Sequence, residues 1–278
     1  VVGAAVLFDL VLGGGIAIWN VRRLSDDVTK QVDSGLTQAN EEFLQTYIET
    51  TALRANLLLD RVNAELGTLA GVMQAMSDKP ELQQSLGAVL ERDTAITTPL
   101  VHDEAGGWSQ NAPGAPSVVN VWGYLLDDNK APLPQVEAAI RGSAIMDLIA
   151  PTMMEVGSPK RLMYYIGPKD ASITRSVPYS DLARTLDQHY PGHNQGPSFW
   201  DFFFPGIYEG WQSWLDNPAS RPVDSDVIMT PPYVDAITGA WVVSLFHPLL
   251  TPARDDVAGG VAVDITLDQL VDLVESVN

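Results

Sequence analysis

The chain has 278 residues, of which 46% are hydrophobic and 18% are charged, a balance typical of a folded protein rather than a disordered one. Asp and Glu outnumber Lys and Arg by 35 to 16, for a formal net charge of -19, and a surface of this charge repels the phosphate backbone of nucleic acids. There is no cysteine, which excludes structural disulfides, thiolate nucleophiles and cysteine-ligated metals.

Residues 1–19 are apolar apart from Asp9 and include the run Gly13-Gly14-Gly15. A helix of this length spans about 28 Å, close to the thickness of the hydrocarbon core of a bilayer. We therefore expect the end of a transmembrane helix, in a sequence whose numbering starts inside a longer protein. A signal-peptide core would need a basic flank and a cleavage site, and three glycines weaken a soluble helix. Arg22 and Arg23 taken alone place this end in the cytoplasm, but charge alone does not fix the orientation.

Residues 20–78 contain no proline, and their apolar residues recur in steps of three and four. This spacing predicts an amphipathic helix with one buried stripe. A continuous helix over this range would be about 88 Å long, and Gly35 and Thr50-Thr51 are the places where it could break. We interpret it as a stalk between membrane and sensor, part of which packs on the core and part of which forms a dimer seam.

Beyond Pro80 the pattern changes to short strands and helices. Residues 118–126 and 162–166 are apolar runs of strand length, and a turn at 167–170 leads into a further strand at 171–177. Between the first two strands, residues 135–149 have helical spacing. Strands and helices do not alternate as in parallel βαβ folds. The sequence therefore predicts an α+β fold, with helices packed on an antiparallel sheet.

The most aromatic segment is residues 199–215, where eight of the seventeen residues are Phe, Trp or Tyr. We expect Phe202 to Phe204 to pack on the core as a lid or corner, because aromatic rings supply large buried area. For Trp211 and Trp214, packing on the core and forming the wall of a ligand pocket are equally good interpretations.

The C-terminal part, residues 230–270, reads as strand, turn, strand, loop, strand and the start of a helix. The turn runs from Asp235, an acceptor side chain, to Gly239, where a positive φ is easiest. Asp264 lies inside the last apolar strand, and Thr266 is an N-cap for the helix that follows. Asp235 and Asp264 thus belong to one small antiparallel sheet, where a pocket for a small polar ligand could form.

We find no catalytic constellation in the sequence. There is no glycine-rich phosphate loop, no serine nucleophile elbow, no zinc motif and no cofactor fingerprint. His189 and His193 have the i, i+4 spacing of metal ligands, but Pro191 and Gly192 interrupt the helix that would align them. We therefore expect no catalytic residue, no metal site and no cofactor in this chain.

Two motifs give the chain a family resemblance. The turn Pro232-Tyr233-Val234-Asp235-Ala236-Ile237-Thr238-Gly239 and the strand end Val263-Asp264-Ile265-Thr266-Leu267 resemble the distal lobe of double Cache (tandem PAS-like) extracytoplasmic sensor domains of bacterial transmembrane receptors. The segments 121–127 and 164–168 resemble parts of sensor domains that are attached to cyclases, phosphatases or histidine kinases.

The resemblance implies a domain organisation. Residues 1–19 would be the transmembrane helix end and 20–78 the stalk, which would also form a homodimer. Residues 79–266 would be the PAS-like ligand-sensing lobe, and 267–278 a helix leading to a proximal lobe or to the membrane. The protein would lie in the bacterial inner membrane with its sensing lobe outside the cytoplasm, and ligand binding would be relayed through the long helices to a cytoplasmic output module.

The resemblance also implies ligand-binding residues: Asp264, Asp235, Tyr233, Trp214 and Trp211. In members that bind amino acids, Asp and Tyr side chains hold the ligand ammonium, and an Arg-x-Trp-Tyr element holds its carboxylate. If Trp214 takes the Trp position of that element, Gln212 and Leu215 stand where Arg and Tyr would be. The clamp for a carboxylate is then missing, which favours an amine or other cationic ligand over an α-amino acid.

Three classes of function stay open at this point. The first is a small-molecule sensing domain that is not itself an enzyme. The second is a structural or dimerisation module in which the pocket is a packed core. The third is a membrane-anchored hydrolase that uses paired aspartates, although no nucleophile or metal ligands accompany them.

Overall fold

The computed structural model describes residues 33–79, 81–82, 85–86, 101–102, 108–110, 116–156, 160–180, 182–196, 198–222 and 226–275. The predicted transmembrane end at residues 1–19 lies outside this range, as does the start of the predicted stalk. Within the range, no helix is both long enough and apolar enough to cross a membrane. The chain divides into two compact units, residues 1–61 with 270–278, and residues 62–269.

The predicted long helix is confirmed over the part of the chain that is described. Helix α2 (Asp33–Ser77) is continuous, without a break at Gly35 or at Thr50-Thr51. Its residues up to Arg61 belong to the first unit. The remainder belongs to the second unit and buries one apolar stripe completely, at Val62, Leu66 and Leu69.

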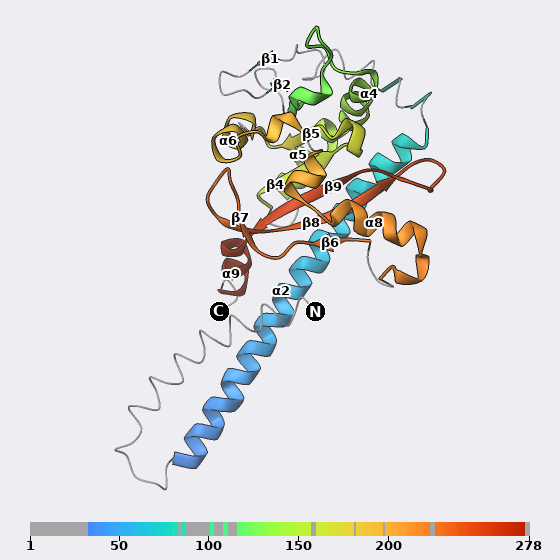
Figure 1. The fold of residues 1–278 in the computed structure, drawn as a ribbon. Helices are drawn as coiled ribbons and strands as arrows, with labels where there is room; N and C mark the ends of the chain where they lie inside the picture. Colours follow the sequence, from blue (N-terminus) through green and yellow to red (C-terminus); the bar gives the residue numbers. More distant parts are fainter. Residues whose placement is uncertain are drawn as a thin grey trace. The chain divides into compact units, whose positions relative to one another are not determined.

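The described part of the second unit contains a nine-stranded antiparallel sheet, with the order β1-β2-β3-β5-β4-β9-β8-β6 and with β7 paired to β8. The predicted α+β class is therefore confirmed (Figure 1). In chain order the strands are β1 (Val101–His102), β2 (Trp108–Gln110), β3 (Val118–Asn120), β4 (Leu162–Ile166), β5 (Thr174–Val177), β6 (Ile228–Met229), β7 (Tyr233–Val234), β8 (Trp241–Leu250) and β9 (Val257–Thr266).

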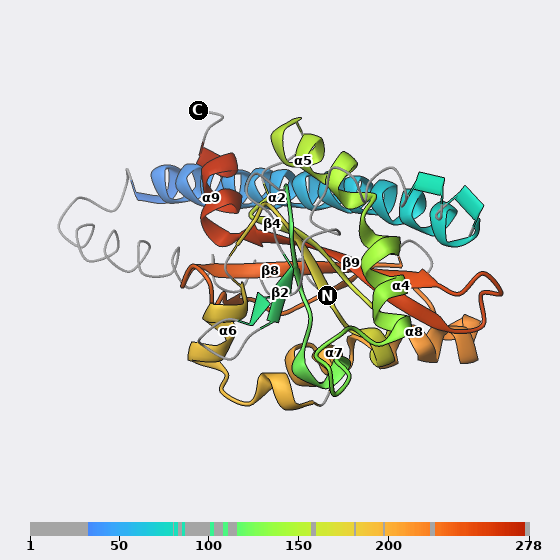
Figure 2. The same ribbon diagram turned by 90° about the horizontal axis from the view of Figure 1, so that it is seen from above.

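Helices cover both faces of this sheet. Figure 2 shows the part of α2 that belongs to the second unit, together with α5, on one side of the strands and α7 and α8 on the other. The helices after α2 are α4 (Pro134–Ser143), α5 (Met146–Val156), α6 (Leu182–His189), α7 (Phe199–Phe203), α8 (Ile207–Asp216) and α9 (Leu267–Glu275). Because β9 is covered on both faces, its residues from Gly259 to Ile265 are all buried, and Asp264 is the only charged residue among them.

Two predicted elements differ from the structure. The strand expected over residues 118–126 ends at Asn120, and a short 3-10 helix follows at Gly123–Leu125. The single helix expected over 135–149 is two helices, because the chain turns at Ala144-Ile145 between α4 and α5. In both places buried apolar residues lie on each side of the break, Val119 and Leu125 at the first and Ile140 and Met146 at the second, so the apolar pattern alone does not reveal the break.

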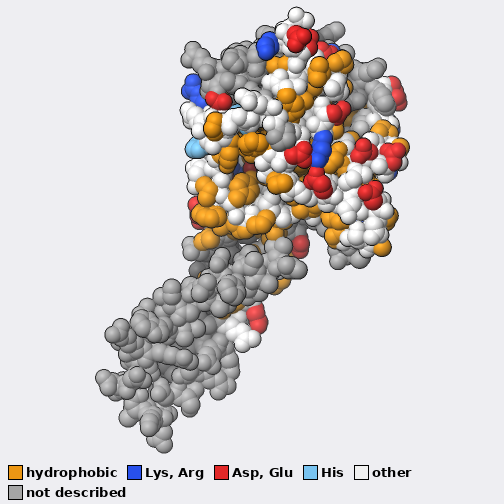
Figure 3. All heavy atoms as spheres, viewed as in Figure 1, with side chains coloured by type: hydrophobic (Ala, Val, Ile, Leu, Met, Phe, Trp, Pro, Cys, Tyr) orange, Lys and Arg blue, Asp and Glu red, His pale blue; other side chains and the backbone are white. Residues whose placement is uncertain are grey.

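Polar contacts join α2 to the sheet within the second unit. The side-chain amide of Gln74 donates to the carbonyl of Leu250 at 2.8 Å and accepts from its N–H at 2.8 Å, so it replaces a strand partner at the end of β8. Lys160, which is almost fully buried just before β4, forms an ion pair with Glu65 of α2. On the face drawn in Figure 3, the charged side chains of the described residues are mostly acidic, with few basic ones.

A buried ion pair holds α4 and α5 against β5. The guanidinium of Arg175 is fully buried, and its Nη1 lies 3.1 Å from each carboxylate oxygen of Asp147. Its other donors reach the hydroxyls of Ser117 and Ser143 at 3.0 Å and the carbonyl of Ile140 at 3.1 Å. Each nitrogen of the guanidinium therefore has an acceptor, which is what a buried charge requires.

This network predicts a large and specific loss of stability. Asp147→Ala leaves the guanidinium buried without a counter-charge and should lower the free energy of unfolding by about 3–5 kcal/mol, measured by urea denaturation. Glu137→Ala is the control, because Glu137 forms an exposed i, i+4 pair with Arg141 and should cost only about 0.5 kcal/mol. Equal losses for the two variants would contradict a structural role for the buried pair.

Candidate ligand-binding site

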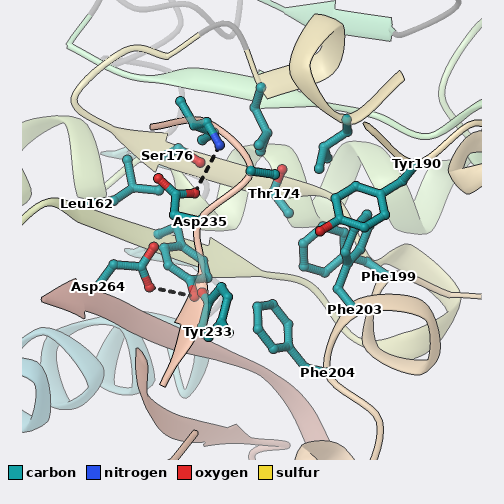
Figure 4. Close-up of a pocket in the computed structure, with 15 residues that line it drawn as sticks. Leu162, Thr174, Ser176, Tyr190, Phe199, Phe203, Phe204, Tyr233, Asp235 and Asp264 are labelled. Atoms are coloured by element: carbon teal, nitrogen blue, oxygen red, sulfur yellow. Dashed lines mark hydrogen bonds between the residues drawn. The ribbon is translucent and has the colours of Figure 1, made fainter. Parts of the chain in front are cut away.

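A pocket of about 80 Å³ lies against one face of the sheet (Figure 4). Arg175 belongs to the other face, because it lies between the lining residues Thr174 and Ser176 on β5 and side chains alternate along a strand. A water molecule needs about 10–15 Å³ on the same scale, so the pocket has room for a short organic molecule. Its floor comes from β4, β5 and β9, one wall from α6 and α7, and its edge from the turn between β7 and β8.

The strand register explains why the floor residues meet. Tyr164 of β4 is paired with Ser176 of β5, and Leu162 of β4 with Asp264 of β9. Thr174 lies two residues from Ser176 on the same strand. Side chains alternate along a strand and paired residues share a face, so all five side chains point to the same side of the sheet.

Asp264 is the only buried carboxylate of the pocket, with 6% of its surface exposed. Its Oδ1 accepts hydrogen bonds from the hydroxyls of Tyr164 at 3.1 Å and Ser244 at 2.5 Å. No Lys, Arg or His is among the described residues that line the pocket, and none of the ion pairs in the described structure includes Asp264. Burial raises the pKa of Asp264 to about 7, although the two hydroxyl donors favour the ionised form.

The donors to Asp264 belong to a longer chain of hydroxyls. The hydroxyl of Tyr233 on β7 lies 2.8 Å from Ser244 Oγ. When Ser244 gives its only hydroxyl hydrogen to Asp264, Tyr233 must be the donor to Ser244. Burial raises the pKa of both Tyr164 and Tyr233 far above the usual value for tyrosine, so both phenols remain neutral donors. All the donors of this chain therefore point toward one carboxylate.

Asp235 lines the same pocket and also shapes its edge. Its Oδ1 accepts from the N–H of Ile237 at 3.1 Å, and its Oδ2 accepts from the N–H and the hydroxyl of Thr238 at 3.1 and 2.5 Å. Gly239 closes the turn with φ of 70°, a conformation that suits glycine. The predicted turn is confirmed, and its carboxylate positions Ala236 and Ile237 at the pocket edge.

The aromatic wall is made by α7 and not by α8. Phe203 and Phe204, which we expected to be lid or core residues, line the pocket together with Phe199. Trp211 is only 1% exposed and lies in the core, its ring 5.5 Å from that of Trp200. Neither Trp211 nor Trp214 lines the pocket. Of the five residues predicted to bind the ligand, the structure thus brings together Tyr233, Asp235 and Asp264.

The sequence patterns did not point to the polar side chains that β4, β5 and the residue after α6 contribute. Tyr164, Thr174, Ser176 and Tyr190 all line the pocket. One signal was available, since Thr174 and Ser176 are alternate polar residues within a buried strand. That alternation places two hydroxyls on one face, but the identity of their neighbours depends on the order of the strands.

No protein-family model and no curated protein matches the chain. The matching solved structures include the ligand-binding domain of the Pseudomonas aeruginosa PAO1 amino acid chemoreceptor PctC in complex with GABA, at 19% identity over 55% of each chain and a TM-score of 0.29. They also include the sensory domain of the Campylobacter jejuni chemoreceptor Tlp3 (CcmL) with isoleucine bound, at 15% identity, 80% of this chain, 66% of that chain and a TM-score of 0.29.

A further match is the ligand-binding domain of Mlp24 with asparagine, at 20% identity over 52% of this chain and 55% of that chain, with a TM-score of 0.24. The chain spans 55% to 66% of the length of these three domains. These three TM-scores are far below 0.5, so the matches carry no conclusion about the function of this chain.

The raised pKa of Asp264 predicts how stability depends on pH. The carboxyl ionises near its ordinary value of 3.8 in the unfolded chain and near about 7 in the folded protein. Between these two pKa values the folded state holds a proton that the unfolded state has released. The free energy of unfolding therefore falls as the pH rises from the unfolded to the folded pKa, and the contribution of the protonated Asp264 is lost once the pH has passed about 7. Asp264→Asn stays neutral throughout. Its stability relative to the unmodified protein should rise from about pH 4 to about pH 8 by on the order of 2–4 kcal/mol.

Thermal and urea unfolding at several pH values measure this difference. Asp128→Asn, which removes an exposed carboxylate outside the pocket, controls for the loss of one negative charge. A difference between Asp264→Asn and the unmodified protein that does not change with pH would contradict a raised pKa at Asp264.

Proposed function

We propose that this chain is the extracytoplasmic small-molecule sensing domain of a bacterial transmembrane receptor, and that its pocket binds an amine or another cationic ligand at Asp264. The observation that carries the proposal is a buried carboxylate in a pocket whose described lining contains no cationic side chain. A buried charge is stable only when it is paired. A ligand ammonium would supply the missing partner.

The pocket also favours a cation by its aromatic lining. Phe199, Phe203, Phe204 and Tyr190 line it, and aromatic faces attract an ammonium, more strongly when water is excluded. A ligand carboxylate would meet Asp264 and Asp235 with no basic side chain to balance it in the described lining. The acidic and aromatic lining therefore favours an amine over an α-amino acid, whether or not residues 212–215 correspond to the Arg-x-Trp-Tyr element.

The fold offers a route by which binding could be transmitted. Asp264 lies three residues before Leu267, the first residue of α9. A capping box joins the strand to this helix: Thr266 N–H donates to Gln269 Oε1 at 2.9 Å, and Gln269 N–H donates to Thr266 Oγ1 at 3.1 Å. We propose that a shift of β9 on binding is passed to α9, and from the long helices of a homodimer to a cytoplasmic cyclase, kinase or phosphatase module.

The proposal predicts that amine binding depends on pH in one direction. An aliphatic amine with a pKa near that of lysine stays charged, whereas Asp264 must lose its proton before it can pair with the amine. The affinity measured by calorimetry should therefore fall about tenfold per pH unit below about pH 6. Asp264→Asn should weaken binding at pH 8 by at least about tenfold, and Asp128→Asn should not. Amine binding that ignores both the pH and Asp264→Asn would rule out the proposed site.

Variants at the same site distinguish a sensing domain from a structural module. If the pocket is only a packed core, Asp235→Ala and Asp264→Ala should change the output of the full receptor no more than they change its stability. If the pocket senses a ligand, Asp264→Asn should abolish the response in a receptor that remains folded, measured as output against ligand concentration alongside thermal unfolding.

A further inference from the structure

We propose that the ligand is an amine with an uncharged hydrogen-bonding group at its other end, such as a hydroxyl or an amide, and that Ser176 determines specificity by binding this group. The inference rests on the proposed function, because it assumes that the ammonium lies at Asp264. Ser176 would be a second contact point for the ligand, and the group that it binds would be uncharged.

The hydroxyl of Ser176 is buried and has no partner. Ser176 is only 1% exposed, and its Oγ is one of six buried side-chain polar atoms without a hydrogen bond in the described part of the chain. Of those six atoms, only this one belongs to a residue that lines the pocket. Buried hydroxyls are nearly always paired, so an unpaired one at a cavity surface indicates a place for a ligand atom.

Thr174 adds a second unused donor beside Ser176. Its Oγ1 accepts from Asn120 Nδ2 at 3.4 Å, and no described group accepts its own hydroxyl hydrogen. Thr174 also lines the pocket. Two hydroxyls on one face of β5 can therefore donate to the same acceptor atom of a ligand, or one can donate while Ser176 accepts.

The position of Ser176 requires a ligand with two separate polar ends. Ser176 lies on β5 and Asp264 on β9, with β4 between them, which separates them by about 10 Å across the sheet. They are also displaced by two residues along it, because Ser176 is paired with Tyr164 and Asp264 with Leu162. Figure 4 shows Ser176, Asp235 and Asp264 along one side of the pocket and Phe199, Phe203 and Tyr190 across from them. A short chain carrying polar groups at both ends would use the two sites and leave its apolar middle against the rings.

The charge of the pocket decides which group fits at Ser176. The described lining contains two carboxylates, Asp235 and Asp264, and no basic side chain. An anionic group beside Ser176 would be repelled by both carboxylates, and serine and threonine hydroxyls carry no charge to offset this. An uncharged acceptor avoids the repulsion and still satisfies the unpaired hydroxyl.

Three probes of equal chain length test the inference on the purified chain: pentylamine, aminopentanol and aminopentanoate, with the nitrogen and the second polar group at opposite ends. Calorimetry should find aminopentanol bound about 3–10-fold more tightly than pentylamine, the gain expected for one hydrogen bond. Aminopentanoate should bind more weakly than aminopentanol. Ser176→Ala should reduce the preference for aminopentanol to less than about twofold without changing the affinity for pentylamine.

Ser180→Ala is the matched control, since Ser180 Oγ is also unpaired but Ser180 does not line the pocket. Ser176→Ala removes an unpaired hydroxyl, so it should melt no lower than the unmodified protein. If Asp264→Asn removes amine binding while Ser176→Ala leaves the preference intact, the role of Ser176 is refuted and the proposed function stands. If aminopentanoate binds best, the restriction to an uncharged end group is refuted together with the preference against a ligand carboxylate, and only the pairing of the ammonium with Asp264 is left to be tested by Asp264→Asn. If none of the probes binds, or if Asp264→Asn leaves their binding unchanged, both proposals fail.

Discussion

The uncompensated carboxylate of Asp264 is the constraint around which the pocket is organised. A second buried carboxylate, Asp147 of α5, is joined to the same sheet by its ion pair with Arg175 of β5. Asp147 is paired with Arg175, whose nitrogens all have acceptors, as expected for an ion pair that joins elements of the fold. Asp264 has hydroxyl donors but no described cation. The protein therefore buries one carboxylate together with a cation, at Asp147, and another without a described cation, at Asp264. The second carboxylate faces a cavity.

The position of Asp264 depends on strand register, because a shift of one residue turns a side chain to the other face of a sheet. β9 is paired with β4 on one side and with β8 on the other. These pairings place Tyr164 and Ser244 beside the carboxylate. The turn held by Asp235 then brings Tyr233 next to Ser244. The site is thus a consequence of the central strands, and it does not rely on a long loop.

The sequence predicted features that depend on neighbouring residues and missed those that depend on residues far apart in the chain. The turn at Asp235, the strand around Asp264 and the helix after Thr266 are local patterns, and all three were predicted. Ser176 and Tyr164 could not be found this way, because the order β5-β4-β9 places β9 beside strands far from it in the chain. The aromatic wall was ambiguous for a related reason. Residues 199–215 form two helices, and only packing decides which of them faces the cavity.

The hydroxyl chain gives the protonation of Asp264 a structural consequence. When the carboxylate is ionised, it accepts from Tyr164 and Ser244, and Ser244 in turn must accept from Tyr233. A neutral carboxyl carries its own hydrogen and no longer imposes this direction on the chain. A cation beside the carboxylate would favour the ionised form, in which a single arrangement of donors runs across β7, β8, β9 and β4. Of these four strands, β9 continues directly into α9.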